Sequence, residues 1–302
     1  MSAVNDSKST HTVFLLTGIP GHEDVHLWIA VPFCLMYVIL ILGNSVILFI
    51  IKTDSSLHEP MYIFLSMLAI TDLGLSIATA PTILGVFFFN SREISLDACL
   101  AQLFFIHFLQ CTESAVLLLM AFDRFVAISN PLRYTSILTL PRIVKMGLVY
   151  VLRGVAVILP LPLLLKRYRY CRDNILSHSY CLHQEVMKLA CSDITVNNIY
   201  GLSGSILIMG LDSLLIFLSY VMILQTVLSI ASREECLKAL NTCISHLCIV
   251  LLFYTPELIN SSHLLQIILD YLYLLLPPLL NPIVYSVKCR HLRARLIRLC
   301  VK

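Results

Sequence analysis

The stretch MAFDRFVAISNPLRY, residues 120–134, puts an adjacent acid and base inside an apolar run. Asp123 and Arg124 follow a long apolar segment, and apolar residues resume directly after them. A charge that faced lipid there would cost several kcal/mol, so some use for the pair is expected. What that use is depends on the kind of chain that surrounds it.

The composition indicates a membrane protein. The chain has 302 residues, of which 58% are hydrophobic and only 13% are charged, whereas about a quarter are charged in an ordinary soluble domain. Mean hydropathy is +0.87. Apolar stretches of about 20 residues recur, each long enough to cross a hydrocarbon core roughly 30 Å thick. They do not alternate as the strands of a membrane barrel would, so the predicted fold is an all-α, polytopic helix bundle.

Seven transmembrane spans are predicted in one domain, 1–302. The domain comprises an extracellular tail at 1–27, the helix bundle at 28–287 and a cytoplasmic tail at 288–302. The first residues, MSAVNDSKSTH, are polar, so no cleavable signal peptide is expected. The predicted spans are 28–51, 60–88, 99–129, 142–165, 194–230, 238–259 and 264–287.

The distribution of Lys and Arg sets the orientation. With the N-terminus outside, 13 of the 21 Lys and Arg residues lie on cytoplasmic segments and 7 on outer segments, as the positive-inside rule requires. The net charge of +3 therefore reflects topology and does not indicate nucleic-acid binding. The sequon at Asn5 predicts glycosylation of the outer tail. The basic C-terminal segment predicts a short amphipathic helix on the lipids of the inner leaflet.

Four of the eleven cysteines fall on the outer side, where disulfides persist. Sequence alone allows three pairings among Cys99, Cys171, Cys181 and Cys191. The other seven are expected to be free. A zinc site that combines loop cysteines with His178 and His183 is the less favoured alternative.

Several long motifs resemble those of odorant receptors, and within them the class I, or fish-like, group of the rhodopsin-like G-protein-coupled receptor family. The resemblance covers essentially the whole chain. It implies a plasma-membrane receptor, not an enzyme, that binds a small volatile or metabolite ligand in the outer half of the bundle. It also implies activation of a stimulatory, olfactory-type heterotrimeric G protein and a rise in cyclic AMP. The matching stretches are Gly43-Asn44, LHEPMYIFLSMLAITDL (57–73), MAFDRFVAISNPLRY, KALNTCISHL (238–247), PPLLNPIVYSVK (277–288) and the loop at 166–193.

The resemblance assigns a use to the acid–base pair. Asp123 is expected to neutralise Arg124 at the cytoplasmic end of the third span in the resting receptor. Release of Arg124 is expected on activation, because breaking such a pair is a two-state event. The alternative is an interfacial Arg that reaches for the headgroups and switches nothing. Phe125 stands where the family more often has Tyr, without an expected loss of coupling.

Two carboxylates lie in otherwise apolar spans and are functional candidates. The resemblance places Asp72 and Glu113 in the centre of the bundle near Asn281. A sodium or proton site that stabilises the resting receptor is expected there, and two carboxylates this close disfavour double ionisation. A satisfied hydrogen-bond network without an ion is the alternative. Apart from this possible sodium ion, no cofactor is expected.

The resemblance also places the odorant pocket and pairs the outer cysteines. On the third span the helix period puts four pocket candidates on one face, although His107 could equally be a packing residue. The implied disulfides are Cys99–Cys181 and Cys171–Cys191. The predicted ligand contacts are Phe104, His107, Phe108, Cys111, Gln184, Asn198, Ser203 and Tyr254.

The chain departs from the family after Phe253-Tyr254-Thr255-Pro256. About two helical turns that class I relatives usually carry are missing, and the sixth span, 238–259, is left with 22 residues, or roughly 33 Å of helix. A basic residue is lost with those turns, and Glu257 adds negative charge near the mouth. We therefore expect weak or no recognition of carboxylic acids. A folding-impaired variant of the receptor is an open alternative.

Other function classes are less favoured. A metabolite receptor of a non-olfactory tissue has the same sequence features as an odorant receptor. A transporter or channel is disfavoured because no inverted repeat or broken helix pair is visible. An intramembrane enzyme is disfavoured because no metalloprotease or nucleophile-elbow motif occurs.

Overall fold

The computed structural model describes residues 12–19, 26–171, 173–228, 243–244, 247, 250–251 and 263–300. In this part of the chain six helical segments are long and apolar enough to cross a membrane. They coincide with six of the seven predicted spans, and an all-α bundle is confirmed. The predicted sixth span, 238–259, lies almost entirely outside the described residues. The six segments are α1 (His26–Thr53), α2 (Pro60–Phe89), α3 (Leu96–Ser129), α5 with α6 (Leu140–Ile158 and Pro160–Leu165), α8 with α9 (Thr195–Ser205 and Leu211–Leu228) and α11 (His263–Lys288).

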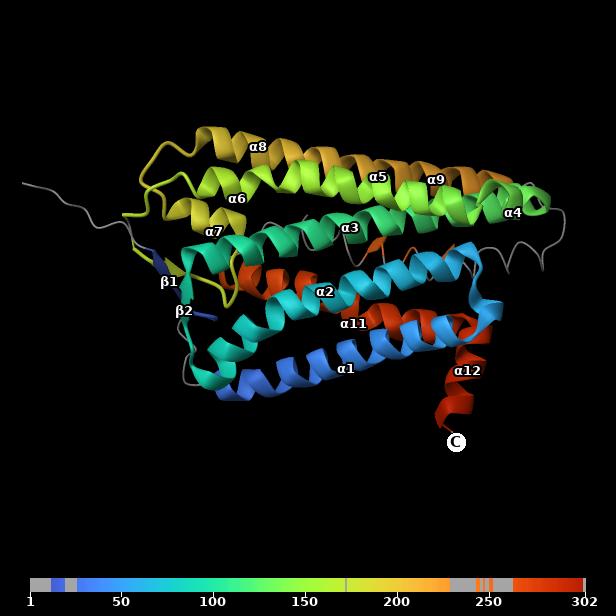
Figure 1. Cartoon of the computed structure of the whole chain (residues 1–302), viewed down its shortest axis with the longest axis horizontal. Coiled ribbons are helices and arrows are strands. Elements are labelled where there is room, and N and C mark those ends of the chain that lie inside the picture. The colour runs from blue at the N-terminus through green and yellow to red at the C-terminus, as the bar shows by residue number, and fades with distance from the viewer. Residues whose placement is uncertain are drawn as a thin grey trace, which may run out of the picture.

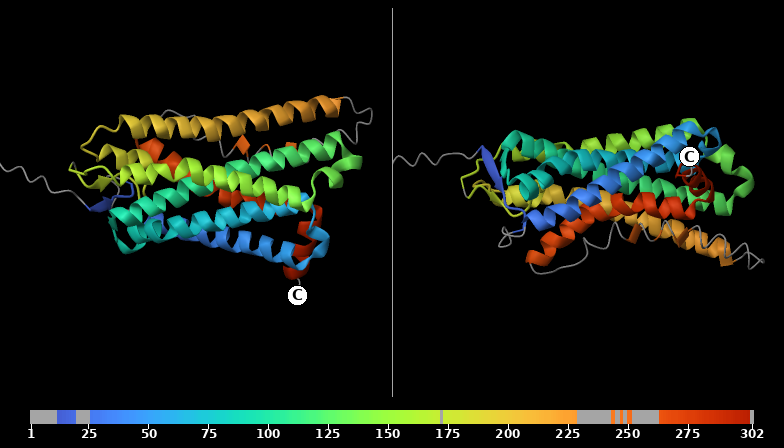
Figure 2. Two further views of the ribbon diagram at one scale, coloured as in Figure 1. Left: turned by 45° about the horizontal axis from the view of Figure 1, so that its top comes forward. Right: turned by 90° about the horizontal axis from the view of Figure 1, so that it is seen from below.

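The long helices lie side by side along one axis, with a small sheet at one end and α4 and α12 at the other (Figures 1 and 2). α3 runs through the middle and packs on α2, α5 and α9. In its most apolar stretch 67% of the residues are buried, against 22% in Thr195–Leu228. The peripheral helices expose large apolar side chains such as Ile77 and Phe217, as a lipid-facing surface requires.

Local sequence signals set the helix ends. α2 begins at Pro60, whose missing N–H costs nothing in a first turn. It ends at Asn90, which adopts φ 51° in the left-handed region. α3 begins after Ser95, whose hydroxyl accepts from the amide of Ala98 at 3.4 Å.

The fifth span contains a π-helical turn, Ile206–Gly210, between α8 and α9. Such turns insert an extra residue and are frequent at functional sites. This turn brings Ile208 and Met209 to the wall of the internal cavity described below.

A lid closes the outer end of the bundle. β1 (Val13–Leu16) pairs antiparallel with β2 (Glu93–Ser95) and parallel with β3 (Ile175–Leu176). Phe14 is fully buried and meets the Tyr170 ring edge-on, with centroids 5.2 Å apart. Residues 1–27 were predicted to be an extracellular tail, so strand β1 was not predicted. The short helix α7 (His183–Lys188) lies under the lid.

Two disulfides hold the lid in place. Cys99 at the start of α3 is bonded to Cys181, and Cys171 is bonded to Cys191. These are the two pairings that the resemblance implies. The two disulfides use all four outer cysteines, so none of these cysteines has a free thiol to bind zinc in the alternative site.

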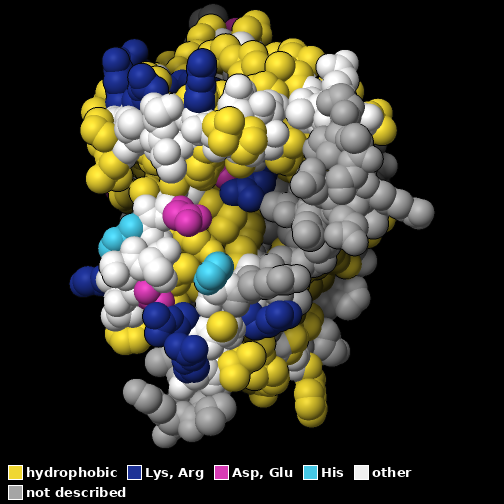
Figure 3. All heavy atoms as spheres, turned by 90° about the vertical axis from the view of Figure 1, so that its right-hand side faces the viewer, with side chains coloured by type: hydrophobic (Ala, Val, Ile, Leu, Met, Phe, Trp, Pro, Cys, Tyr) yellow, Lys and Arg dark blue, Asp and Glu magenta, His cyan; other side chains and the backbone are white. Residues whose placement is uncertain are grey.

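The opposite end carries many of the Lys and Arg residues (Figure 3). Here lie the short helices η2 (Ser55–Leu57), η3 (Pro131–Arg133) and α4 (Tyr134–Ile137), and the predicted amphipathic helix α12 (Arg290–Cys300). α12 leaves the bundle axis at a steep angle (Figure 1). Its Leu292 is fully buried, and Arg295 forms an ion pair with Asp54. Figure 3 looks onto this end, where Lys and Arg side chains gather, in agreement with the predicted orientation.

Candidate functional site

A cavity of about 470 Å³ lies at the lid end of the bundle. This volume is within the range of roughly 300–1,000 Å³ that small-molecule sites occupy. One wall is apolar, made by Val157, Ile158, Leu161, Ile208 and Met209. The remaining described lining is largely polar and comes from α3, the lid, α7, α8 and α11. Its polar members include His107, Gln110, His178, His183, Gln184, Glu185, Lys188, Asn198, Gln266 and Asp270.

Four of the eight predicted ligand contacts line this cavity: His107, Cys111, Gln184 and Asn198. They come from α3, α7 and α8, so helices far apart in sequence converge on it. Tyr254 lies outside the described residues, as does the predicted glycosylation site at Asn5.

Phe104 and Phe108, also predicted as ligand contacts, are not among the described residues that line this cavity. Their rings stack on each other, with centroids 5.7 Å apart and planes 6° apart. They belong to the packing cluster of Ile158 and Leu161. A Cβ on Gly154 would come within 3.3 Å of the Phe108 ring, so this glycine admits the ring between α3 and α5. The helix period placed all four α3 candidates on one face of the helix, but only His107 and Cys111 of that face line the cavity.

Ser203, another predicted ligand contact, does not line the cavity either. Its side chain is exposed on the outer face of α8, and its hydroxyl donates to the carbonyl of Tyr200 at 2.9 Å. Gly201, Gly204 and Ser205 face the cavity instead. The π-helical turn that follows shifts the register of the fifth span, and no feature of the sequence announces it.

His183 is the central polar group of the lid helix α7. Its Nε2 lies 3.0 Å from Oδ1 of Asn197, and its ring centroid lies 6.5 Å from that of His107. Burial lowers the pKa of His183, and the hydrogen bond to Asn197 only partly opposes this. The imidazole is therefore neutral at physiological pH.

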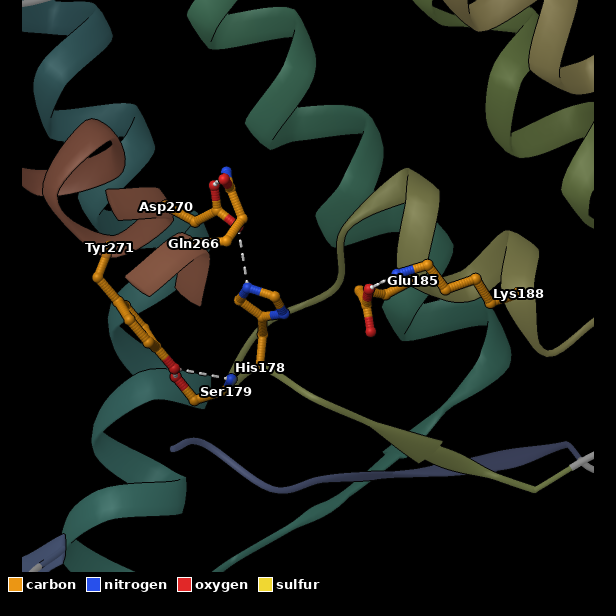
Figure 4. Close-up of polar contacts among 7 residues, drawn as sticks. All are labelled: His178, Ser179, Glu185, Lys188, Gln266, Asp270 and Tyr271. Atoms are coloured by element: carbon orange, nitrogen blue, oxygen red, sulfur yellow. Dashed lines mark hydrogen bonds and ion pairs between the residues drawn. The ribbon is translucent and has the colours of Figure 1, made fainter. Parts of the chain in front are cut away.

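The outer end of the cavity contains two carboxylates (Figure 4). Asp270 on α11 accepts from Gln266 Nε2 at 3.0 Å and lies 3.1 Å from His178 Nε2. Glu185 on α7 accepts from Lys188 Nζ at 2.5 Å. Burial opposes ionisation of Glu185, but Lys188 outweighs it and the pKa of Glu185 is lowered. Neither acid was predicted, although Asp270 lies in an apolar span and meets the same criterion that identified Asp72.

A second unpredicted group lies midway along the bundle. Arg153 on α5 donates to both oxygens of Asp212 on α9, at 2.8 and 2.6 Å. Ser114 on α3 donates to Asp212 at 2.9 Å, and the Arg153 guanidinium lies 4.9 Å from the centre of the Tyr150 ring. Asp212 is fully buried. The sequence does contain a signal for this pair, because Arg153 and Asp212 are charged residues within two otherwise apolar spans.

The structure brings together the three predicted members of the ion site. Asn281 Nδ2 donates to Asp72 Oδ2 at 3.0 Å, and Glu113 lies close enough to interact with both. All three side chains are buried. In this group of three side chains, one buried oxygen of each has no hydrogen-bond partner among the described residues: Asp72 Oδ1, Glu113 Oε1 and Asn281 Oδ1.

The acid–base pair at the inner end of α3 is formed as expected. Arg124 Nε donates to Asp123 at 2.9 Å, and Tyr134 of α4 donates to the other oxygen of the same carboxylate at 2.6 Å. Burial and the adjacent carboxylate raise the pKa of Tyr134. Asp123 is buried, whereas 16% of the Arg124 side chain remains exposed. The last residue of the opening motif thus joins the pair, a role that the sequence analysis did not assign.

Comparisons with known proteins agree with this arrangement. The model of a family described as olfactory receptor matches residues 33–302. Human olfactory receptor 51G2 is 59% identical over 300 residues, which covers 96% of each chain. Human olfactory receptor 51G1 is 54% identical over 99% of this chain and 96% of its own. Human olfactory receptor 51A4 is 54% identical over 99% of both chains.

Proposed function

The chain belongs to the olfactory receptor family, and we propose that its odorant binds in the cavity beneath the lid. It is an odorant receptor of the class I group, a multi-pass protein of the plasma membrane, and not an enzyme. Coupling to a heterotrimeric G protein is implied by the family. The specific ligand contacts, the G protein and any bound ion belong to the proposal.

The observation that carries the proposal is a small-molecule-sized cavity with one apolar wall and opposing polar groups. Volatile ligands are small and mainly apolar, so burial against Ile158, Ile208 and Met209 supplies affinity. His107, Gln184 and Asn198 offer hydrogen bonds that orient the ligand. Cys111 lies on the same stretch of wall as His107.

The proposal is tested by cyclic AMP in cells that co-express the stimulatory olfactory G protein. An odorant panel of acids, alcohols, aldehydes, ketones and amines is applied, and surface staining is measured in parallel. We expect at least one ligand class to raise cyclic AMP, and we expect Arg124→Ala to abolish the response at equal surface staining. A response unchanged by Arg124→Ala would contradict the assigned switch.

The resting state is held by the acid–base pair at the inner end of α3. Arg124 and Tyr134 both donate to Asp123, so releasing Arg124 breaks charge-assisted hydrogen bonds. In the proposed switch, Arg124 leaves Asp123 and contacts the bound G protein instead. These are two discrete arrangements of Arg124, as an allosteric switch requires. We assign the stimulatory, olfactory-type G protein as the partner, with cyclic AMP as the signal.

A sodium ion is proposed between Asp72, Glu113 and Asn281. Three buried oxygens without a hydrogen-bond partner fit a hard cation, which prefers oxygen ligands. An ion there would also offset the repulsion between the two carboxylates. A ligand-free receptor that loses thermal stability when sodium is replaced by a large organic cation, with no such loss in Asp72→Asn, supports the site. Equal stability in both salts would contradict it and favour a shared proton.

A further inference from the structure

The outer end of the cavity contains titratable side chains to which the proposed function assigns no role. His178 of the lid lies between Asp270 on α11 and the end of α7 that carries Glu185 (Figure 4). All three residues line the cavity. The inference drawn here rests on the proposed function, because it names the ligand class of the same cavity.

The hydrogen bond to Asp270 fixes which nitrogen of His178 carries the proton. A carboxylate only accepts hydrogen bonds, so Nε2, 3.1 Å from Asp270 Oδ2, carries the hydrogen. In the neutral imidazole the other nitrogen, Nδ1, is then an acceptor. His178 is only 4% exposed, and its Nδ1 has no hydrogen-bond partner among the described residues. A buried acceptor without a partner is unfavourable, so a ligand that donates a hydrogen bond is stabilised here.

The described charged residues that line the cavity are two carboxylates, Glu185 and Asp270, and one cation, Lys188. Lys188 forms an ion pair with Glu185 and offsets that carboxylate. Asp270 receives hydrogen bonds from Gln266 and His178, and no Lys or Arg of the described residues forms an ion pair with it. A cationic head group would therefore complement Asp270, whereas a second carboxylate would be repelled.

We infer that the outer end of the cavity selects a ligand whose head group donates hydrogen bonds and carries positive charge: a small aliphatic amine. The ammonium group donates to His178 Nδ1 and lies within the field of Asp270. The alkyl chain extends along the apolar wall of Ile158, Ile208 and Met209. Alcohols satisfy the hydrogen bond alone and rank second. Ethers and carboxylates lack a donor or carry the wrong charge, and rank last.

The test compares four ligands of one chain length: a primary amine, an alcohol, a methyl ether and a carboxylic acid. Thermal unfolding of the purified, full-length receptor is measured with each, because a ligand that binds the folded state raises the unfolding midpoint. We expect the amine to raise the midpoint most, then the alcohol. A carboxylate or ether that stabilises as well as the amine overturns the inference, and this ranking needs no variant.

Variants locate the head group. Asp270→Asn keeps the shape of the side chain and removes its charge. We expect it to raise the amine concentration needed for half-maximal stabilisation about tenfold, because the ammonium group loses a nearby opposite charge, with little effect on the uncharged alcohol. Glu93→Gln, at an exposed outer carboxylate away from the cavity, is the matched control and should change neither. An amine effect that is unaltered by Asp270→Asn overturns the inference.

Signalling separates this inference from the proposed function. Stabilisation by the amine without any cyclic AMP response contradicts receptor signalling and leaves the amine site supported. A cyclic AMP response to carboxylic acids alone supports the receptor function and overturns the amine site.

Discussion

At the scale of single residues, Tyr134 donates one hydrogen bond to Asp123, 2.6 Å long, and in the proposed switch this bond stabilises the resting state. Tyr134→Phe removes only that hydroxyl, and loss of a hydrogen bond to a charged carboxylate costs the resting arrangement about 1.5–3 kcal/mol. We expect ligand-independent cyclic AMP to rise several-fold at equal surface staining. Ser136→Ala, which removes an exposed hydroxyl of the same helix that bonds only to a local carbonyl, is the control. Lower or unchanged basal cyclic AMP in Tyr134→Phe would contradict the assigned role of this contact.

Another residue-scale prediction concerns the pH dependence of the lid. Because the pKa of His183 is lowered in the folded protein, the unfolded chain binds more protons at mildly acidic pH. The contribution of His183 to stability is therefore complete above its unfolded pKa of about 6.5 and declines as pH falls below it. We expect the unfolding midpoint to drop between neutral and mildly acidic pH, and to drop less in His183→Gln. An identical pH profile in the variant would refute this assignment.

At the scale of elements, strand β1 is part of the lid because Phe14 fills a space beneath it. Phe14→Ala removes a fully buried ring, at a cost of about 3–5 kcal/mol. We expect a large loss of surface staining and of thermal stability. The neighbouring Val13 is 40% exposed, so Val13→Ala is the matched control and should be close to wild type. Equal losses in both variants would show that burial of Phe14 is not what holds the lid.

The contact between α5 and α9 depends on the buried pair of Arg153 and Asp212. Asp212→Leu leaves Arg153 without its partner and should lower the free energy of unfolding by about 3–5 kcal/mol. Replacing both, with Arg153→Met and Asp212→Leu, should recover most of this loss in thermal unfolding. Asp97→Asn, which breaks the exposed pair with Lys166, should have little effect. If the double variant were as unstable as Asp212→Leu alone, an unpaired Arg153 would not be the cause of the lost stability.

The elements differ in how well the sequence predicts them. Apolar runs of membrane length identified six described spans, because lipid requires a closed backbone and apolar side chains over a fixed length. The π-helical turn at Ile206–Gly210 was not predicted, and Ser203, just before it, lies outside the cavity lining. Strand β1 was missed because its stability comes from Tyr170 and β3, which lie far away in the sequence.

At the scale of the whole molecule, one bundle joins a ligand cavity at the lid end to an acid–base pair at the basic end (Figure 1). Motif resemblance predicted both places and the disulfides, because those motifs occupy fixed positions on the helices. It did not predict that Phe104 and Phe108 pack outside the cavity, nor the acid Glu185 of α7. These depend on how the lid and α7 fold back over the bundle, which no local pattern specifies.

The most direct test of the central claim compares two polar residues of α8, Asn198 and Ser203. Asn198 lines the cavity and Ser203 does not. Concentration–response curves of cyclic AMP are measured for Asn198→Ala and Ser203→Ala at matched surface staining, with the most potent ligand of the panel. If the odorant binds in this cavity, Asn198→Ala should raise the half-maximal concentration about tenfold and Ser203→Ala should leave it unchanged. A shift in Ser203→Ala with none in Asn198→Ala would place the ligand elsewhere and contradict the account.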